Sequence, residues 1–426
     1  MVISKPESRN PWSWVPTLYF LEGVPYVIVN LVSVAFYKKM GISNTDIALY
    51  TSLLYLPWVV KPLWSPSVDM IKTKRFWILI MQFVIGLGFI GLTIFATSSD
   101  FFFITLLFFC MIAFSSATHD IAADGFYMIG LNEKQQAFFV GIRSTFYRIA
   151  MWTGQGLLLF IAGYFEVTTG SIPLSWQYTF ILITILYLGI LVYHNFILPY
   201  PKTDKPAKSE KGQLSEFIKI FKLFFKKDNI GLTITFLLIY RFGEAQLVKL
   251  AQPFFLDPRS AGGLGLSLEE IGLAYGTVGV ISLLVGGVFG GIVVSRDGLK
   301  KWIWWMFAAI NIPHIVYIFL AFVQPGNIYL ITLCIAGEQF GYGFGFTAYM
   351  LYMIYASQGE FKTSHFAICT GFMALSMMLP GAVSGIIQEF LGYKLFFVWV
   401  LITMIPGYFI VKILPFDPEF GKKTEE

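Results

Sequence analysis

Long apolar runs alternate with short polar segments along almost the whole chain. Each run is about 20 residues or longer, which is the length that a helix needs to cross the hydrocarbon core of a bilayer. The runs predict twelve membrane-spanning helices, six on either side of a polar segment at 199–229. They cover residues 13–37, 46–67, 76–97, 101–126, 138–164, 175–198, 230–256, 269–294, 302–323, 327–353, 364–388 and 393–413.

The pattern predicts four parts of the chain. They are an N-terminal six-helix half at 1–198, a linker at 199–229, a C-terminal six-helix half at 230–413 and a tail at 414–426. Within the linker, apolar residues of 214–225 fall at helical spacing with lysines between them. This spacing predicts a basic amphipathic helix on the inner leaflet of the membrane.

Composition supports a membrane protein and excludes several other classes. Hydrophobic residues make up 56% of the chain, and charged residues make up 13%, about half of the roughly 25% found in soluble proteins. A soluble globule, a nucleic-acid binder and a disordered chain are therefore excluded. The three cysteines lie in apolar stretches, and no nucleotide-binding loop, zinc spacing or hydrolase elbow is present. We expect no metal, no cofactor and no catalysis.

The basic residues predict how the chain is oriented. With both ends inside, the inner segments hold 21 lysines and arginines, and the outer loops hold four. Because cytoplasmic loops carry the excess of Lys and Arg, both termini are predicted to be cytoplasmic.

The two halves of the chain are weakly similar to each other. Four short matches keep an offset of 224 to 229 residues: 46–49 with 270–273, 74–75 with 300–301, 104–106 with 331–333, and 163–164 with 392–393. Parallel halves related by an axis along the membrane normal are the arrangement of the major facilitator fold. We therefore predict an all-α membrane protein of this fold, with a pseudo-twofold axis along the membrane normal.

Ionisable residues inside the spans are restricted to certain helices. A charge in the bilayer costs about 2.5–3.5 kcal/mol on insertion scales, so each one needs a reason. The first, fourth, seventh and tenth spans carry Glu22, Asp120, Asp124, Arg241, Glu244, Lys249 and Glu338, whereas the third, sixth, ninth and twelfth hold no Asp, Glu, Lys or Arg in their interiors. In a major facilitator fold the first set lines the central cavity, so the charges predict a water-accessible path.

The carboxylates divide into two expected roles. Glu22, Glu338 and Asp120 are the candidate proton-coupling residues, since Glu22 and Glu338 have no opposite charge within a turn of their own helices. Because an unpaired charge inside a membrane protein is costly, we predict the pairs Asp124–Arg143 and Asp120–Arg148. Asp69 and Arg75 are a further candidate structural pair.

Two further sets of residues have either a functional or a purely structural role. Arg241 and Glu244 are three residues apart, so they either neutralise each other or hold substrate. His119 either relays protons or is a hydrogen-bonded core residue, and His194 and His314 are interpreted as packing or interfacial residues.

The candidate substrate-binding residues combine charge with aromatic faces, which suit sugar rings. The alternative for the aromatic members is ordinary packing in the membrane core. The set consists of Lys61, Arg148, Arg241, Glu244, Tyr26, Trp58, Tyr147, Tyr240 and Tyr342.

Several stretches resemble the AmpG muropeptide permeases, within the peptide/acetyl-coenzyme A/drug transporter branch of the major facilitators. The most specific is Ser-Ala-Thr-His-Asp-Ile-Ala-Ala-Asp at 116–124. The others are Pro-Trp-Val-Val-Lys-Pro-Leu-Trp-Ser-Pro at 57–66, Phe-Tyr-Arg-Ile-Ala-Met at 146–151, Tyr-Arg-Phe-Gly-Glu at 240–244 and Glu-Gln at 338–339. The chain departs from the family at His119, where Gln is usual, and at Met70, where Arg is usual.

This resemblance implies proton-driven import of N-acetylglucosaminyl-anhydro-N-acetylmuramyl peptides across a Gram-negative inner membrane, for cell-wall recycling. It makes Asp120, Asp124, Lys61, Arg148, Glu244 and Glu338 candidate functional positions. The expected partners are a sugar–peptide conjugate, protons and the lipid bilayer, with the protein a monomer. The alternatives are a major facilitator with another cargo, such as acetyl-coenzyme A, a siderophore or a drug, and a non-transporting muropeptide sensor.

Overall fold

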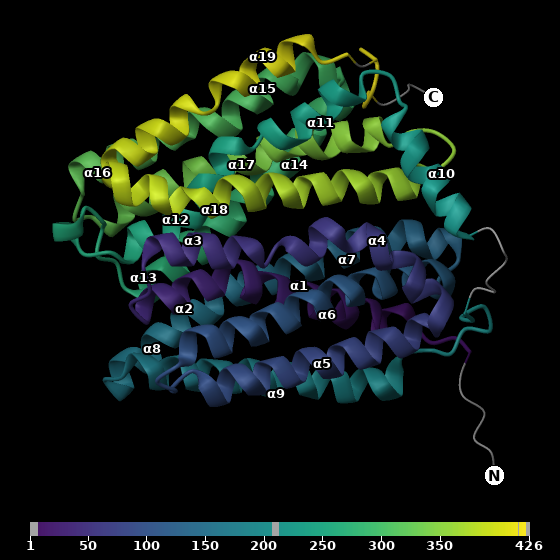
Figure 1. The fold of residues 1–426 in the computed structure, drawn as a ribbon, viewed down its shortest axis with the longest axis horizontal. Helices are drawn as coiled ribbons and strands as arrows, with labels where there is room; N and C mark the ends of the chain where they lie inside the picture. Colours follow the sequence, from purple (N-terminus) through teal and green to yellow (C-terminus); the bar gives the residue numbers. More distant parts are fainter. Residues whose placement is uncertain (1–6, 207–212, 416, 423–426) are drawn as a thin grey trace. The chain divides into compact units, whose positions relative to one another are not determined.

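The computed structural model describes residues 7–206, 213–415 and 417–422, without the side chains of residues 69, 133, 137, 213–216 and 363. Every regular element in these ranges is a helix (Figure 1). Twelve helical stretches of the described residues follow one another in the order of the predicted spans. The prediction of an all-α protein is therefore confirmed.

The chain divides into two compact units, which we call the N-unit and the C-unit. The N-unit contains Met1–Met40 and Val60–Glu210, and the C-unit contains Gly41–Val59 and Lys211–Glu426. By sequence, the helix Asn44–Leu53 belongs to the first predicted half, but its contacts place it in the C-unit. The division of the chain by sequence stays a prediction.

The N-unit is built from helices that are broken in places by short 3₁₀ or π segments. In chain order they are η1 (Pro11–Ser13), α1 (Val15–Val27), η2 (Ile28–Val32), α2 (Ser33–Lys39), α4 (Leu56–Ile71), α5 (Lys74–Phe95), α6 (Phe101–Gly130), α7 (Glu133–Trp152), η3 (Thr153–Leu158), α8 (Leu159–Thr169) and α9 (Ile172–Ile197). The first residues of α4, up to Val59, belong to the C-unit. Helix α5 packs against α6 and α9, and α1 packs against α7 and α6 (Figure 1).

The C-unit contains the remaining helices. They are α3 (Asn44–Leu53), α10 (Gln213–Phe225), α11 (Ile230–Ile239), α12 (Phe242–Leu256), η4 (Arg259–Ala261), α13 (Leu268–Ile271), η5 (Gly272–Gly279), α14 (Val280–Asp297), α15 (Leu299–Asn311), η6 (Ile312–His314), α16 (Ile315–Val323), α17 (Ile328–Ala356), α18 (Lys362–Ile402) and α19 (Ile405–Ile413). Helix α17 packs against α14 and α15, and α18 packs against α3 and α12.

Local sequence explains where several helices begin and break. Asn132 and Ser267 each form a capping box with the residue three positions later, which satisfies backbone donors that a helix leaves open at its start. Helix α18 is interrupted at Gly392, whose φ of 66° suits a residue without a Cβ atom. This break falls between the predicted eleventh and twelfth spans.

Glycines bring α17 into backbone contact with both of its neighbours. A Cβ atom on Gly343 would lie 2.0 Å from the carbonyl oxygen of Leu283 on α14, and one on Gly341 would lie 2.2 Å from that of Ala309 on α15. Contacts this short leave no room for any side chain, so α17 is wedged between α14 and α15. Close packing, typical of small residues at helix interfaces in membranes, accounts for these glycines.

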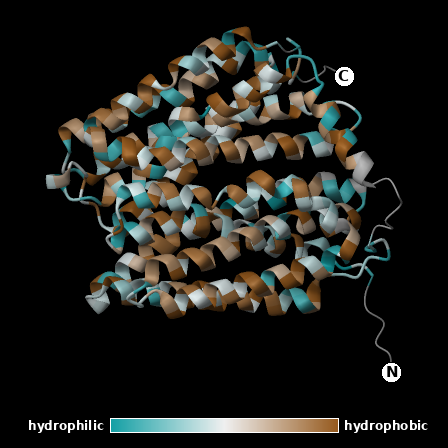
Figure 2. Cartoon of the chain, in the orientation of Figure 1, coloured by the Kyte–Doolittle hydropathy of each residue, from teal (hydrophilic) through white to brown (hydrophobic). Residues whose placement is uncertain are grey.

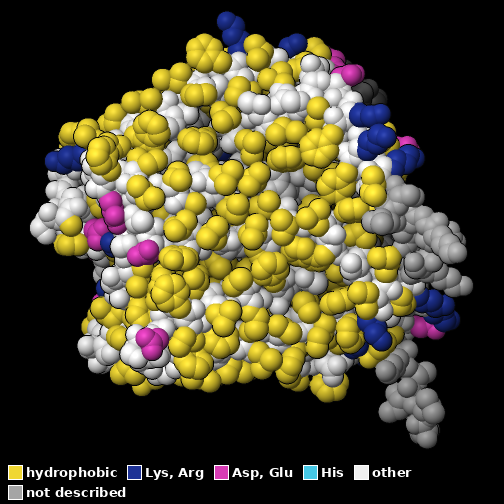
Figure 3. Space-filling view, in the orientation of Figure 1, with side chains coloured by type: hydrophobic (Ala, Val, Ile, Leu, Met, Phe, Trp, Pro, Cys, Tyr) yellow, Lys and Arg dark blue, Asp and Glu magenta, His cyan; other side chains and the backbone are white. Residues whose placement is uncertain are grey.

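The surface of the helices is mostly apolar. Large hydrophobic side chains such as Phe83, Ile185, Trp305 and Phe409 are exposed on α5, α9, α15 and α19. These helices belong to the third, sixth, ninth and twelfth spans, which carry no charge in their interiors. Figure 2 shows hydrophobic residues along the helices, and Figure 3 shows a face covered mainly by apolar side chains. By length and composition alone, seven stretches of the described residues can each cross a membrane.

The helix predicted in the linker is present as α10, and it packs against α18 within the C-unit. Phe224 is fully buried and its ring stacks on that of Phe372, at 6.4 Å between centroids. Ile218 is exposed, so α10 also presents an apolar side chain to its surroundings. Its place on the inner leaflet stays a prediction.

Candidate functional site

Charged side chains of three helices gather in the interior of the N-unit. Lys61 on α4 donates a hydrogen bond to Asp120 on α6, and the side chains of this ion pair are each 19% exposed. The structure thus places Lys61 beside Asp120, a contact that the sequence had not indicated, and the pairing of Asp120 with Arg148 stays a prediction. The Lys61–Asp120 pair depends on how α4 and α6 are rotated against each other, which sequence spacing within one helix does not reveal.

The predicted contact between Asp124 and Arg143 is present. Nη2 of Arg143 on α7 lies 2.9 Å from Oδ1 of Asp124 on α6. The hydroxyl of Tyr19 donates to the same oxygen at 3.1 Å, and the guanidinium lies over the Tyr19 and Tyr127 rings at 4.4 and 5.3 Å. Asp124 is thus held by a cation and a hydroxyl, and Arg143 by a carboxylate and two aromatic faces.

Glu22 lies on α1, one helical turn beyond Tyr19. It is 8% exposed, and its Oε2 atom has no hydrogen-bond partner among the described residues. Asp120 and Asp124 repel its anionic form, whereas Arg143 and Lys61 attract it but are already bound to Asp124 and Asp120. Each of these two cations is bound to an aspartate, so Glu22 is a carboxyl group without a cation of its own.

The aromatic candidates of the N-unit lie next to Glu22. The rings of Tyr26 on α1 and Tyr147 on α7 are 6.4 Å apart, and both side chains are partly exposed. Arg148, the next residue on α7, is exposed. Helices α1 and α7 approach closely here because Gly23 has no Cβ atom. A Cβ atom at this position would lie 2.8 Å from Cβ of Ala150. Close packing of α1 against α7 therefore holds Tyr26, Tyr147 and Arg148 near Glu22.

His119 belongs to a separate polar network in the core. Gln82 on α5 hydrogen-bonds to His119 at 3.0 Å and to His194 on α9, also at 3.0 Å. His194 in turn contacts the hydroxyl of Thr17 at 2.9 Å. Of the two interpretations of His119, the geometry favours a hydrogen-bonded core residue.

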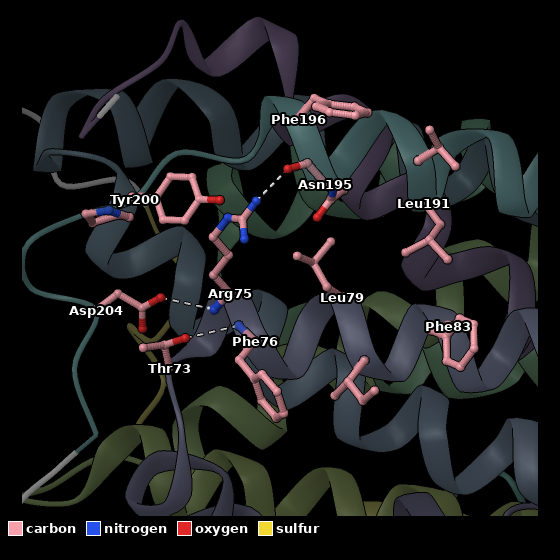
Figure 4. A pocket seen from close by; sticks show the side chains of 13 residues that line it. Thr73, Arg75, Phe76, Leu79, Phe83, Leu191, Asn195, Phe196, Tyr200 and Asp204 are labelled. Carbon is pink, nitrogen blue, oxygen red and sulfur yellow. Dashed lines mark hydrogen bonds between the residues drawn. The ribbon is translucent and has the colours of Figure 1, made fainter. Parts of the chain in front are cut away.

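Arg75 binds the chain that follows α9. Its Nη2 atom donates to the carbonyl of Asn195 at 2.7 Å, its guanidinium lies 3.9 Å from the Tyr200 ring, and its backbone N–H donates to Asp204 (Figure 4). The side chain of Asp69 lies outside those that the structure describes, so the pair with Asp69 stays a prediction.

A groove of about 710 Å³ runs along α5 and α9 beside Arg75. Apolar side chains such as Leu79, Phe83 and Leu191 line it (Figure 4). It shares no residue with the charged cluster and offers mainly hydrocarbon contacts, so it does not belong to the candidate site.

In the C-unit, Arg241 is surrounded by aromatic rings. Helix α11 ends at Ile239 and α12 begins at Phe242, so Arg241 lies at a break within the seventh span. Its guanidinium donates to the hydroxyl of Tyr342 and lies 4.8 to 5.8 Å from the ring centroids of Tyr342, Phe346 and Tyr349. Such a cage suits a planar cation.

Glu244 contacts a histidine. Oε2 of Glu244 lies 2.9 Å from Nε2 of His314 at the end of η6, and both side chains are fully buried. Arg241 contacts Tyr342 and its neighbouring rings, and Glu244 contacts His314, so the geometry does not decide whether Arg241 and Glu244 neutralise each other or hold substrate. His314, interpreted from sequence as a packing or interfacial residue, is fully buried, and its ring also contacts a buried carboxylate.

Glu338 on α17 lies beside this pair. Its Oε2 atom accepts hydrogen bonds from Gln339 at 2.9 Å and from Tyr317 at 3.4 Å, and the residue is 1% exposed. Ligand atoms of Glu244, His314 and Glu338 all lie within 4.8 Å of one another. Both glutamates were candidate site residues from sequence, whereas His314, Gln339 and Tyr317 were given no role in the site.

Three further residues complete the picture of the C-unit. Tyr240 lies in the hydrophobic core and donates its hydroxyl to the carbonyl of Gly345 at 2.9 Å, which fits packing better than substrate contact. Lys249 is buried, donates to Thr51 at 3.0 Å and lies over the Tyr55 ring. Trp58, at the start of α4, is half-buried.

Comparisons with known proteins assign the fold and the family. The model of the Major Facilitator Superfamily matches residues 17–358. The chain is 27% identical over 418 residues to "Putative transporter AmpG 4" of Rickettsia conorii, covering 93% of this chain and 94% of the relative. It is 22% identical over 403 residues to the anhydromuropeptide permease of Escherichia coli K12, covering 93% of this chain and 78% of the relative.

Solved structures agree with this assignment. A D-xylose–proton symporter matches with a TM-score of 0.71 at 12% identity, covering 95% of this chain and 97% of that one. The nucleoside transporter NupG matches with a TM-score of 0.67 at 14% identity, covering 94% and 98%. The resemblance to AmpG proteins is confirmed by relatives named AmpG or anhydromuropeptide permease, which match this chain over most of its length. The protein is thus a multi-pass membrane transporter rather than an enzyme, and it belongs to the Major Facilitator Superfamily.

Proposed function

We propose that this protein imports anhydro-muropeptides or related sugar–peptide conjugates from the periplasm to the cytoplasm, driven by protons. It works by alternating access in a bacterial inner membrane, with both termini cytoplasmic. The relatives named AmpG and anhydromuropeptide permease support the cargo. The excess of lysine and arginine in alternate loops supports the orientation.

The observation that carries the proposal is the unequal charge balance of the N-unit cluster. Within each of the pairs Lys61–Asp120 and Arg143–Asp124 the two charges cancel. Glu22 adds one more carboxyl group beside these pairs. A buried carboxylate without a cation is strongly disfavoured, whereas a protonated one is tolerated. Glu22 therefore holds a proton while it is buried and releases it when the cavity admits water.

The charge cluster also explains how protons and cargo become coupled. Protonation of Glu22 removes its repulsion with Asp120 and Asp124, which favours the closed packing of α1 on α6 and α7. Cargo and proton then bias the same two-state equilibrium, which is what coupling requires. Asp120 contributes as the anion that tunes Glu22 and is itself held by Lys61.

Cargo contacts are proposed separately for each unit. In the N-unit, Arg148 meets a carboxylate of the conjugate, and Tyr26 and Tyr147 offer aromatic faces to its sugar rings. In the C-unit, Tyr342 offers a hydroxyl and Arg241 a guanidinium at the break of the seventh span. Glu338, predicted from sequence to couple protons, lies in surroundings that favour another role, which is argued below.

Uptake by the purified protein in liposomes tests the proposal. A labelled anhydro-muropeptide should accumulate when an inward proton gradient is imposed, and only equilibrate without it. Glu22→Gln should abolish gradient-driven accumulation while exchange of labelled for unlabelled cargo continues. Glu166→Gln, which alters a partly exposed pair with Lys39, should behave as the unchanged protein and serves as the control.

Each other outcome would contradict one part of the proposal. Gradient-driven accumulation by Glu22→Gln would remove Glu22 from coupling but leave the cargo in place. Binding of cargo without any accumulation by the unchanged protein would favour the sensor. No binding and no uptake by folded protein would overturn the cargo class.

A further inference from the structure

Three ionisable side chains from separate elements of the C-unit meet in its interior. Glu244 comes from α12, His314 from the end of η6 and Glu338 from α17. Their ligand atoms lie within 4.8 Å of one another, and no other His, Cys, Asp or Glu cluster among the described residues meets this condition. All three residues are buried, at 0 to 1% exposure.

The hydrogen bonds of these residues leave one polar atom unsatisfied on each. Nε2 of His314 contacts Oε2 of Glu244, and Oε2 of Glu338 accepts from Gln339 and Tyr317. Among the described residues, Oε1 of Glu244, Oε1 of Glu338 and Nδ1 of His314 are buried without a partner. Buried polar atoms are almost always hydrogen-bonded, so three unsatisfied atoms in one cluster indicate a missing ligand.

The donor set defines the chemistry of that ligand. As metal ligands, two carboxylates and an imidazole supply two negative charges, which one divalent cation would compensate. Imidazole favours first-row transition metals, whereas Mg²⁺ and Ca²⁺ prefer sites made of oxygen atoms alone. Three protein ligands of this kind, with a fourth position left for water, are a common arrangement around Zn²⁺.

We propose that Glu244, His314 and Glu338 form a binding site for one divalent transition-metal ion, with Zn²⁺ as the best fit. Gln339 and Tyr317 orient the Glu338 carboxylate through its Oε2 atom and leave Oε1 for the metal. The site goes beyond the proposed transport function, because the proton step uses the N-unit cluster. A bound ion would tie α12, η6 and α17 together.

Metal binding by the purified full-length protein in detergent tests the site directly. After dialysis against a chelator, the unchanged protein is equilibrated with Zn²⁺ and its metal content is measured. We expect one Zn²⁺ per chain, unaffected by excess Mg²⁺. Replacement by Co²⁺ should give a visible absorption band, which reports coordination without relying on transport. Binding and release should be slow, because buried side chains must move to admit the ion.

Variants assign the binding to these residues. Glu338→Gln and His314→Gln should each weaken Zn²⁺ binding by about tenfold or more and alter the Co²⁺ band. Glu22→Gln, which changes a buried carboxyl in the N-unit, is the matched control and should bind as tightly as the unchanged protein. Helical circular dichroism and a single chromatographic peak establish that each variant is folded.

Two results would overturn the proposal. One is an unchanged protein that takes up no stoichiometric Zn²⁺ and gives no Co²⁺ band, a result that does not depend on any variant folding. The other is folded Glu338→Gln and His314→Gln protein that binds Zn²⁺ as tightly as the unchanged chain. Neither result affects the uptake assay, so failure of the metal site and failure of the transport proposal are distinguishable.

Discussion

Both units carry ionisable side chains inside their helices, but they stabilise them differently. In the N-unit, Asp120 and Asp124 each meet a cation, and the four side chains of these pairs are 19 to 39% exposed. In the C-unit, the fully buried carboxylates meet an imidazole, an amide and a hydroxyl. Its cations lie elsewhere, Arg241 among aromatic rings and Lys249 beside Thr51.

This difference separates two uses of intramembrane charge. Ion pairs that stay partly exposed avoid the full desolvation of their charges and can be broken and reformed as water enters. Carboxylates that are buried without a cation, as Glu22 is in the N-unit and Glu244 and Glu338 are in the C-unit, must bind a proton or a metal ion to remain stable. The N-unit cluster therefore suits a site that responds to protons and cargo, and the C-unit cluster suits a site that holds an ion.

The largest expected effect comes from breaking one pair of the N-unit. Lys61→Met leaves Asp120 without its cation, so we expect the free energy of unfolding to fall by about 3 kcal/mol, the lower end of the range for broken buried pairs. The double variant Lys61→Met/Asp120→Leu should recover most of that loss but not transport. Thermal unfolding in detergent at a fixed heating rate measures both. Equal losses in the single and double variants would show that the pair is not what stabilises this site.

A smaller effect is expected at the aromatic cage of the C-unit. Arg241→Lys keeps the charge but removes the planar guanidinium that faces three rings and binds Tyr342, so stability should fall by about 2 kcal/mol. Arg296→Lys, at an exposed position, is the control and should change stability by less than about 0.5 kcal/mol. If the two variants lose the same stability, the rings do not stabilise Arg241.

Asp124 should matter mainly for folding. Asp124→Asn removes the charge that meets Arg143, but the pair is about one-third exposed, so the expected loss is about 1 kcal/mol. The amount of folded protein should fall while uptake per folded molecule is kept. Normal abundance with no uptake would contradict the structural role and move Asp124 into the coupling machinery.

The smallest change in stability is expected for substitution of Glu338, a buried carboxylate of the C-unit. In the presence of a chelator, Glu338→Gln replaces a buried acid by a neutral side chain of the same shape, so stability should stay within about 1 kcal/mol of the unchanged protein. The same unfolding assay measures it. If Glu338→Gln lowered the free energy of unfolding by about 3 kcal/mol, as expected for Lys61→Met, the two units would not differ in how they stabilise their buried charges.

Sequence predicted most of the fold because bilayer thickness fixes the length of the apolar runs. All twelve predicted spans have a helical counterpart, and the boundary before the twelfth falls at Gly392. The break before Arg241 could not be predicted, since it accompanies capture of the guanidinium by rings of α17, about 100 residues further along the chain. The π segments likewise have no signature in the apolar pattern.

Part of the candidate site could be predicted because an unpaired charge inside a membrane protein is costly. The contact of Asp124 with Arg143 followed from that cost, but the contact of Asp120 with Lys61 depends on the rotation of α4 and was missed. His314 was missed because 70 residues separate it from Glu244. A signal was available in Pro313, which interrupts the predicted ninth span and is followed directly by a polar residue.

The wedging of α17 between α14 and α15 has a practical consequence for following motion in this transporter. Because Gly341 and Gly343 touch backbone on both sides, a spectroscopic label near them would disturb the helix it is meant to report on. Gly337 is exposed and has no atom within 4 Å of the position where a Cβ would stand. A single cysteine there places a reporter next to Glu338, on the side of α17 where a label has room.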